Sequence, residues 1–200
     1  MVHDREPEAR HPTADRIAAA AGELLVERGA AAVTMRAVGN AVGLSAMAIY
    51  KHFPNREALL RAVVDDELRK LSRTWGRRRE SDDFEGRLLG LQDDFLDLAL
   101  GKPHLYSFLI TERREQARRF PHDFRDGGTP AFAPVHALVT EAIRQGVLKD
   151  GDPVEVTLGL TSGTVGLVQF YLGGRVGLSE PEFRELCRRT IRRVLDGIRA

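Results

Sequence analysis

Apolar residues recur every three or four positions along most of this 200-residue chain, and no segment sustains the alternating pattern of a half-buried strand. This spacing matches the period of an α-helix, so the chain is expected to be all-α. Capping residues, glycines and prolines separate the apolar segments, as they do at helix ends. Asn55 can cap the helix that follows it, and Ser179 with Glu182 three residues on forms a capping box for the last helix. The helices expected from these signals cover residues 13–28, 34–42, 45–52, 55–79, 84–100, 103–109, 133–145, 153–173 and 180–199, with 120–130 as a loop.

The first three expected helices are short, closely spaced and marked by capping residues. Thr13, Thr34 and Ser45 are each placed to N-cap one of them, because a hydroxyl oxygen accepts hydrogen bonds from the free N–H groups of a first turn. Gly43 and Leu44 form the tight connection between the second and third helices. This arrangement is the signature of a helix-turn-helix unit, whose recognition helix can enter the major groove of DNA.

The formal net charge of +1 does not by itself suggest a nucleic-acid partner, but the charges are unevenly distributed. Residues 1–80 carry a net charge of +3 and residues 81–200 a net charge of −2. So small a surplus favours DNA affinity that depends on a few placed contacts. The composition, 42% hydrophobic and 30% charged, fits a folded globular protein. The single cysteine, Cys187, excludes an intramolecular disulfide and a zinc site built from cysteines.

Residues 156–174 carry no charge and include a GxxxG pattern from Gly159 to Gly163, as some membrane helices do. Threonines, a serine, a glutamine and several glycines in the same stretch favour instead a helix buried in a core or between subunits. Residues 1–11 are polar and lack the apolar region of a secretory signal. We therefore expect a cytoplasmic protein without membrane association.

Five short motifs within residues 13–64 occur together in one known pattern. They are Glu27-Arg28-Gly29, Thr34, Gly43-Leu44-Ser45, Ile49-Tyr50-Lys51-His52-Phe53 and Arg56-Glu57-Ala58-Leu59. This stretch resembles the N-terminal domain of TetR-family transcriptional regulators. Further along, the step from Gly146-Val147-Leu148 to Asp152-Pro153 resembles the join between the seventh and eighth helices of many members.

The resemblance implies a domain organisation and a function. The implied segments are a flexible N-terminal arm over 1–12, a helix-turn-helix DNA-binding domain over 13–56, and a C-terminal helical regulatory and dimerisation domain over 57–200. The function implied is that of a ligand-responsive regulator, usually a repressor, which a small-molecule effector releases from its operator.

A homodimer is also implied, in which helices 153–173 and 180–199 pair with their copies. Small residues allow the close helix approach that this needs: Gly159, Ser162, Gly163 and Gly166. A symmetric dimer presents two recognition helices, so the double-stranded operator is expected to be pseudo-palindromic.

The DNA contacts are expected to combine phosphate binding with some reading of bases. Chemistry and the resemblance together give the expected set as Thr34, Arg36, Ser45, Ala46, Met47, Tyr50, Lys51, His52 and Arg56. Only Lys51 matches a strong base pairing, with guanine O6 and N7, whereas Ala46 and Met47 suit thymine methyl groups. Many family members have a threonine where this chain has Ala48, so one phosphate-binding hydroxyl is missing. We therefore expect modest direct readout and a sizeable contribution from DNA shape.

The effector pocket is expected inside the C-terminal domain, with a mostly apolar wall. The expected lining residues are Phe84, Leu88, Leu105, Tyr106, Leu109, Phe120, Phe124, His136, Val139, Thr161, Val165, Gln169 and Phe170. Such a wall, with Tyr106, His136 and Gln169 as its polar anchors, suits a small hydrophobic or aromatic effector. We expect no cofactor and no metal, since the Glu8 to His11 spacing lacks a second carboxylate.

Two other classes of function stay open on the sequence alone. A helical enzyme has little support, because the GxSxG, P-loop, HExxH and GxGxxG motifs do not occur. A helical protein–protein adaptor that has lost DNA binding is the main alternative, and the missing hydroxyl at Ala48 is its support. The arginines between Arg184 and Arg199 are expected to form a solvated face rather than a second nucleic-acid surface.

Overall fold

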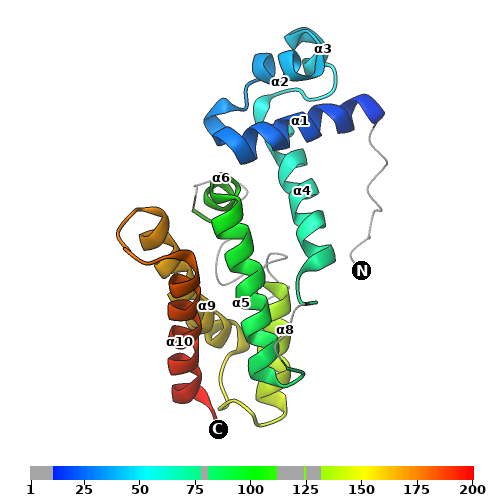
Figure 1. Ribbon diagram of the computed structural model, residues 1–200. Helices are drawn as coiled ribbons and strands as arrows, with labels where there is room; N and C mark the ends of the chain where they lie inside the picture. Colours follow the sequence, from blue (N-terminus) through cyan, green and yellow to red (C-terminus); the bar gives the residue numbers. More distant parts are fainter. Residues whose placement is uncertain (1–10, 78–80, 112–123, 125–131) are drawn as a thin grey trace, which may run out of the picture. The chain divides into compact units, whose positions relative to one another are not determined.

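The computed structural model describes residues 11–77, 81–111, 124 and 132–200 (Figure 1). Over these residues the expected all-α class is confirmed, since an isolated antiparallel bridge between Leu148 and Arg199 is the only β pairing among them. The chain divides into two compact units, the first ending at Glu67 and the second beginning at Leu68.

The first unit is built from short helices joined by tight connections. These are α1 (Pro12–Arg28), a 3-10 turn (Ala30–Ala32), α2 (Met35–Val42), α3 (Ala46–Tyr50) and the first turns of α4 (Arg56–Thr74). Helix α1 packs against α2, and α2 packs against α3. Their inner faces carry the fully buried Ile17, Leu25, Val38 and Ile49.

Helix α1 begins one residue earlier than expected, and Thr13 is not its cap. His11 is the N-cap, because its Nδ1 accepts a hydrogen bond of 3.2 Å from the N–H of Thr13. Pro12 suits the first helical position, since its missing N–H has no intrahelical partner there. At the other end Gly29 ends the helix, but with a φ of 80° and an extended ψ of 171° it does not adopt the left-handed helical conformation common at such ends.

The division between the units falls inside α4, whereas the sequence placed the domain boundary between residues 56 and 57. The first half of α4 buries Leu59, Leu60 and Val63, and Val63 packs beside Gly22 of α1. This packing explains why those turns belong to the first unit.

Helix α4 also ends at Thr74 rather than near residue 79. Gly76 interrupts it with φ +78°, and the N–H of Gly76 donates a 3.0 Å hydrogen bond to Asp94 Oδ2.

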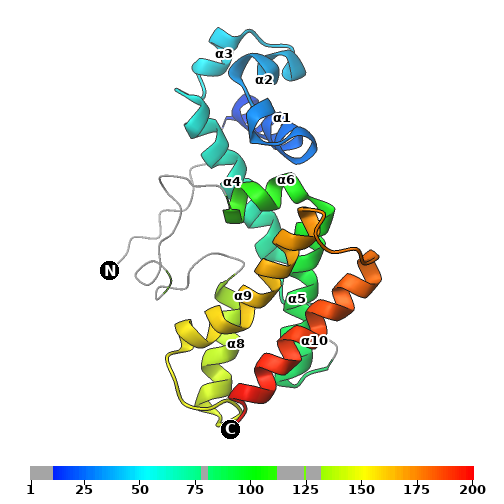
Figure 2. The ribbon, with the colours of Figure 1, turned by 90° about the vertical axis from the view of Figure 1, so that its left-hand side faces the viewer.

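The second unit packs the long helix α5 (Phe84–Gly101) against three others, α8 (Ala133–Arg144), α9 (Pro153–Leu172) and α10 (Glu180–Ile198), as Figures 1 and 2 show. A short α6 (Pro103–Tyr106) follows α5 and continues into a π-helical turn, Ser107–Thr111. The expected loop over 120–130 lies outside the described residues, apart from Phe124. None of the described helices, α9 included, combines the length and apolarity that crossing a membrane requires.

The expected capping box at the start of α10 is confirmed. The Glu182 carboxylate accepts hydrogen bonds from both the N–H and the hydroxyl of Ser179, at 2.8 and 2.6 Å. This exchange satisfies groups that a helix start leaves free. Helix α10 then buries Phe183, Cys187, Ile191 and Leu195 at four-residue spacing.

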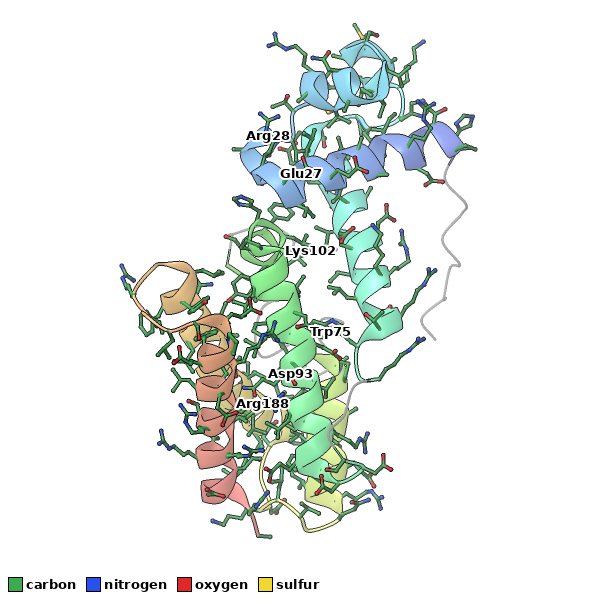
Figure 3. All side chains as sticks on the ribbon, viewed as in Figure 1. Glu27, Arg28, Trp75, Asp93, Lys102 and Arg188 are labelled. Carbon is green, nitrogen blue, oxygen red and sulfur yellow. The ribbon has the colours of Figure 1, made fainter. Side chains whose placement is uncertain are left out.

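Carboxylates on α5 pair with arginines on α10, so these arginines do not form the purely solvated face that was expected. The pairs are Glu85 with Arg192 and Arg199, Asp93 with Arg188, and Asp97 with Arg184. Figure 3 shows Asp93 and Arg188 pointing toward each other, and their side chains are 9% and 28% exposed. This ladder of ion pairs joins the two helices, because each pair spans the gap between them.

Candidate functional site

The α2–turn–α3 segment is held by local hydrogen bonds. Thr34 Oγ1 accepts from the N–H of Ala37 at 3.1 Å, and Ser45 Oγ accepts from the N–H of Ala48 at 3.2 Å. Both residues therefore cap their helices as the sequence predicts. Between the helices, Gly43 adopts a left-handed conformation with φ +70°, which a glycine adopts without steric cost.

A second glycine sets how closely the turn approaches α2. The N–H of Leu44 donates to the carbonyl of Gly39 at 2.8 Å, which folds the turn back onto the helix. A Cβ added at Gly39 would lie only 2.6 Å from the carbonyl oxygen of Leu44. The close packing of the turn on α2 therefore depends on having no side chain at position 39.

The outer face of α3 is open and carries two large side chains. Ile49 is fully buried, while Met47 is 73% and Tyr50 49% exposed. Lys51, immediately after the helix, is also exposed, and helical spacing places positions 47, 50 and 51 on one face. This face therefore combines the apolar surface of Met47 and Tyr50 with the charge of Lys51.

The other members of the expected DNA set, apart from Arg56, lie at the start of α2, in the turn or at the ends of α3. Thr34, Arg36 and Ser45 are exposed, and Ala46 and His52 are partly exposed. The ring of His52 lies 5.7 Å from the ring of His11, measured between centroids, so it also packs beside the start of α1.

Arg56 has a structural role that the sequence did not suggest, in addition to the phosphate contact expected of it. Its Nε donates to the carbonyl of Val33 at 2.7 Å, and its Nη2 donates to the carbonyl of Ala30 at 2.5 Å. The guanidinium therefore clamps the connection between α1 and α2 onto the start of α4. Arg16, which the sequence did not single out, acts similarly, since its Nη2 donates to the carbonyl of Val42 at 3.3 Å.

The second unit contains a small cavity of about 50 Å³. Its walls come from residue 75, just beyond the end of α4, and from α5, α8, α9 and α10. The lining residues are Trp75, Leu88, Leu91, Gln92, Phe95, Val135, Leu160, Thr161, Thr164, Val165 and Ile191. In Figure 3, Trp75 extends toward α5.

Gln92 is the most polar group of the cavity wall, and the residue is 5% exposed. Its Nε2 donates to Thr164 Oγ1 at 2.8 Å and to the carbonyl of Cys187 at 3.1 Å. Its Oε1 is buried and has no hydrogen-bond partner within the described part of the chain. A buried acceptor without a partner is uncommon, because it loses its hydrogen bonds to water without replacement.

Of the residues expected to line a pocket, the structure brings Leu88, Thr161 and Val165 to this cavity. Others pack in the surrounding core or at its edges: Phe84, Leu105, Tyr106, Leu109 and Val139. Phe124 and His136 both pack on the ring of Phe132, with centroid distances of 4.9 and 5.7 Å. Phe120 lies outside the described residues.

Two of the expected pocket residues lie on the surface near the end of α9. Phe170 is 51% exposed, and Gln169 is exposed while its Nε2 donates to the Tyr106 hydroxyl at 3.0 Å. Burial raises the pKa of Tyr106, and the hydrogen bond from Gln169 partly opposes this. The anchor pair of Tyr106 and Gln169 therefore exists, but neither residue lines the cavity.

Sequence reasoning missed Gln92, although a signal for it was present. In the sequence, Leu88, Leu91 and Phe95 recur at helical spacing, and position 92 lies one turn after Leu88 on the same face. An uncharged polar residue in the middle of an apolar stripe is the pattern that a cavity-facing anchor leaves.

Two family models match the chain. The model for bacterial regulatory proteins of the tetR family matches residues 17–63, and the model for a tetracyclin repressor-like C-terminal domain matches residues 88–194. The two matches fall on the two sides of the division inside α4.

Two uncharacterized HTH-type transcriptional regulators from two strains of Mycobacterium tuberculosis are each 42% identical to this chain over 60 residues. That stretch is 30% of this chain and 30% of each relative. The similarity to these curated relatives therefore spans less than a third of their length.

Solved structures resemble the chain over nearly its whole length. A protein with unknown function from Rhodococcus sp. RHA1 has a TM-score of 0.75 at 20% identity, covering 98% of this chain and 100% of that one. The flavonoid-responsive regulator FrrA has a TM-score of 0.64 at 22% identity, covering 93% of this chain and 96% of that one. At such identities the likeness demonstrates a shared fold.

Proposed function

The chain belongs to the TetR family of bacterial transcriptional regulators, and from that premise we propose that it represses transcription by binding a pseudo-palindromic operator as a homodimer. The observation that carries this proposal is the open face of α3, where Met47, Tyr50 and Lys51 stand exposed beside a rigid, locally capped turn. A helix presented in this way fits the major groove, and its side chains then meet base edges and phosphates.

Each side chain of this face has a role that follows from its chemistry. Lys51 donates to guanine O6 and N7 or to a phosphate, and the Tyr50 hydroxyl donates to a phosphate. Met47 and Ala46 pack against thymine methyl groups. Thr34, Arg36, Ser45 and His52 complete the proposed set. We leave Arg56 out of it, because its guanidinium already holds two backbone carbonyls.

We propose that the dimer forms through α9 and α10. In α9, a Cβ added at Gly159 or Gly166 would meet no atom within 4 Å, so these positions face open space in the single chain. Phe170 and Leu172 near the end of α9 are 51% and 40% exposed, and Leu178 before α10 is 37% exposed. Small residues next to exposed apolar ones are what a close helix–helix contact needs.

This interface has a direct test. A Cβ at position 159 meets nothing within 4 Å in the described part of the chain, so the effect of Gly159→Leu on the oligomeric state reports a partner helix. We expect light scattering to give a dimer for the unmodified protein and a monomer for Gly159→Leu at the same concentration, with unchanged helical circular dichroism. A dimer that persists in the variant at all concentrations contradicts this interface.

An effector that binds the second unit is proposed to release the operator. For release, the effector must bind the form that does not bind DNA more tightly than the form that does. The cavity beside Trp75, at the end of α4, supports this proposal because α4 runs through both units.

The DNA-binding proposal is tested by selecting duplexes from a random pool and measuring affinity against salt concentration. We expect an enriched pseudo-palindrome and a steep salt dependence, because phosphate contacts release counterions. Lys51→Met is expected to weaken binding about tenfold. Lys149→Met removes the same charge in the second unit, where the lysine donates to the Gly197 carbonyl, and is expected to bind like the unmodified protein.

A pool without enrichment contradicts the regulator and favours the alternative, an adaptor that has lost DNA binding. Equal losses from Lys51→Met and Lys149→Met would show that binding depends on overall charge and not on the α3 face.

A further inference from the structure

The walls of the cavity in the second unit are uncharged and mostly apolar, as far as the structure describes them. Among its described lining residues none is charged, and the polar groups are those of Gln92, Thr161 and Thr164 and the indole N–H of Trp75. An ionised ligand there would lose its hydration without gaining a counter-charge, which is strongly unfavourable. The cavity therefore selects neutral molecules.

The orientation of the Gln92 amide follows from its neighbours. The Cys187 carbonyl can only accept a hydrogen bond, so the amide nitrogen of Gln92 must be the atom that faces it. A flipped amide would place two acceptors against each other. The unpartnered atom is consequently Oε1, an acceptor, and it needs a donor.

The other polar groups of the wall do not supply this donor. The Thr161 hydroxyl donates to the Thr157 carbonyl at 2.8 Å, which leaves its oxygen as an acceptor toward the cavity. Thr164 Oγ1 accepts from Gln92 Nε2, and neither its hydroxyl nor the indole N–H of Trp75 donates to Oε1, which has no partner among the described residues. A ligand that carries a hydrogen-bond donor complements both Gln92 Oε1 and the acceptor capacity of Thr161.

We propose that this cavity binds a compact neutral hydroxylated aromatic molecule, whose hydroxyl donates to Gln92 Oε1 while its ring packs against Trp75 and Phe95. The inference rests on the proposed function, since it assigns the chemical class of the effector. Aromatic walls favour an aromatic guest through offset or edge contacts. The same ring is expected to bind more weakly if it lacks a hydrogen-bond donor or carries a charge.

The cavity is smaller than an aromatic ring requires, so binding must change its shape. About 50 Å³ is smaller than the roughly 150 Å³ that admits benzene in an apolar protein cavity. Binding of a ring must therefore move part of the wall. Trp75 is a partly exposed residue of the cavity wall and directly follows the last residue of α4. Its displacement therefore acts on the end of that helix.

The test compares phenol, anisole and benzoate as probes of the full-length protein at pH 7. Trp75 is the only tryptophan in the chain, so its fluorescence reports binding, and calorimetry checks the affinity. We expect phenol to bind about tenfold more tightly than anisole, which has the same ring without a donor. Benzoate is expected not to bind. Equal affinities for phenol and anisole overturn the proposal, as they would if an ordered water satisfied Gln92 Oε1.

Two matched variants test whether Gln92 is responsible for the preference for phenol over anisole. Gln92→Leu is expected to abolish the preference for phenol over anisole, whereas Gln169→Leu, the same change outside the cavity, is expected to keep it. Loss of the preference in Gln169→Leu alone would overturn the assignment to Gln92. If Gln92→Leu does not fold, the comparison of probes on the unmodified protein still decides the question.

Failure of this inference can be told apart from failure of the proposed function. Binding of the selected operator duplex is measured on the same protein samples. Operator binding without any preference for phenol overturns only the assigned effector class, whereas absence of operator binding overturns the regulator itself.

Discussion

The two units build their sites from contacts of very different range. In the first unit, the helix caps and the turn of the α2–turn–α3 segment are closed by hydrogen bonds between residues three to five positions apart, such as Thr34 with Ala37 and Gly39 with Leu44. In the second unit, Gln92 reaches partners 72 and 95 residues away. A site made from local contacts can be recognised in a sequence, whereas a site made from distant ones requires the packed structure.

Breaking a long-range ion pair of the second unit is expected to have the largest effect on stability. Arg188→Met removes the partner of Asp93, whose side chain is only 9% exposed and pairs with Arg188 at 2.5 Å. Leaving a buried carboxylate without its partner is expected to lower the free energy of unfolding by about 3 kcal/mol, measured by urea denaturation.

Arg189→Met is the matched control for that change. Arg189 pairs with Glu185 at 3.5 Å, and both side chains are about half exposed, so a loss below about 0.5 kcal/mol is expected. Equal losses in the two variants would contradict a special role for the pairs between α5 and α10.

The local contacts of the first unit are tested by two glycine-to-alanine changes inside helices. Gly39→Ala forces a Cβ to within 2.6 Å of the Leu44 carbonyl, and we expect it to destabilise the first unit by about 2 kcal/mol. Gly22→Ala places its Cβ at an ordinary 3.7 Å from Val63 and is expected to stabilise by up to about 1 kcal/mol. Thermal unfolding measures both effects, and we expect the two variants to change stability in opposite directions.

Variants of Arg56 and Lys51 test whether the first cation stabilises the fold while the second binds DNA. Arg56→Met leaves the carbonyls of Ala30 and Val33 without their charged donor and is expected to cost about 1.5 kcal/mol of stability. Lys51→Met is expected to change stability by less than about 0.5 kcal/mol while weakening DNA binding. A stability loss in Lys51→Met equal to that in Arg56→Met is the outcome that would falsify this division of roles.

The smallest effect expected is a pH dependence at the end of the ion-pair ladder. The hydrogen bond from Arg192 holds the pKa of Glu85 below its ordinary value of 4.5, with a further contribution from Arg199. Because the folded pKa is the lower one, Glu85 stabilises the fold above the unfolded value and loses this contribution as the pH falls through the folded pKa.

The Glu85 contribution is isolated by comparison with Glu85→Gln. The variant is expected to be less stable by under about 1 kcal/mol at pH 7, with a gap that closes as the pH falls below the ordinary glutamate value of 4.5 and through the lower folded pKa. Unfolding curves at several pH values measure this gap, and a gap independent of pH rejects the assigned pairing.

The caps show where prediction from sequence works. Thr34, Ser45, Asn55 and the capping box of Ser179 and Glu182 were all expected from the chain, since a cap involves residues only a few positions apart. Thr13 was misassigned because His11, two residues earlier, offers a competing acceptor. The structural role of Arg56 was not expected, because its carbonyl partners are brought to it by the packing of α4.

The sequence alone determined the helical class, the capped helix-turn-helix and its outward residues, because a helical period and a tight turn are specified by neighbours along the chain. The tertiary structure decided what the polar groups of the helices meet. It turned the arginines of α10 toward the carboxylates of α5, left Phe170 on the surface, and enclosed Gln92 in a small apolar cavity with one acceptor unmet. These outcomes depend on how helices far apart in sequence pack together, and helical periodicity specifies the inner face of each helix but not which helix covers it.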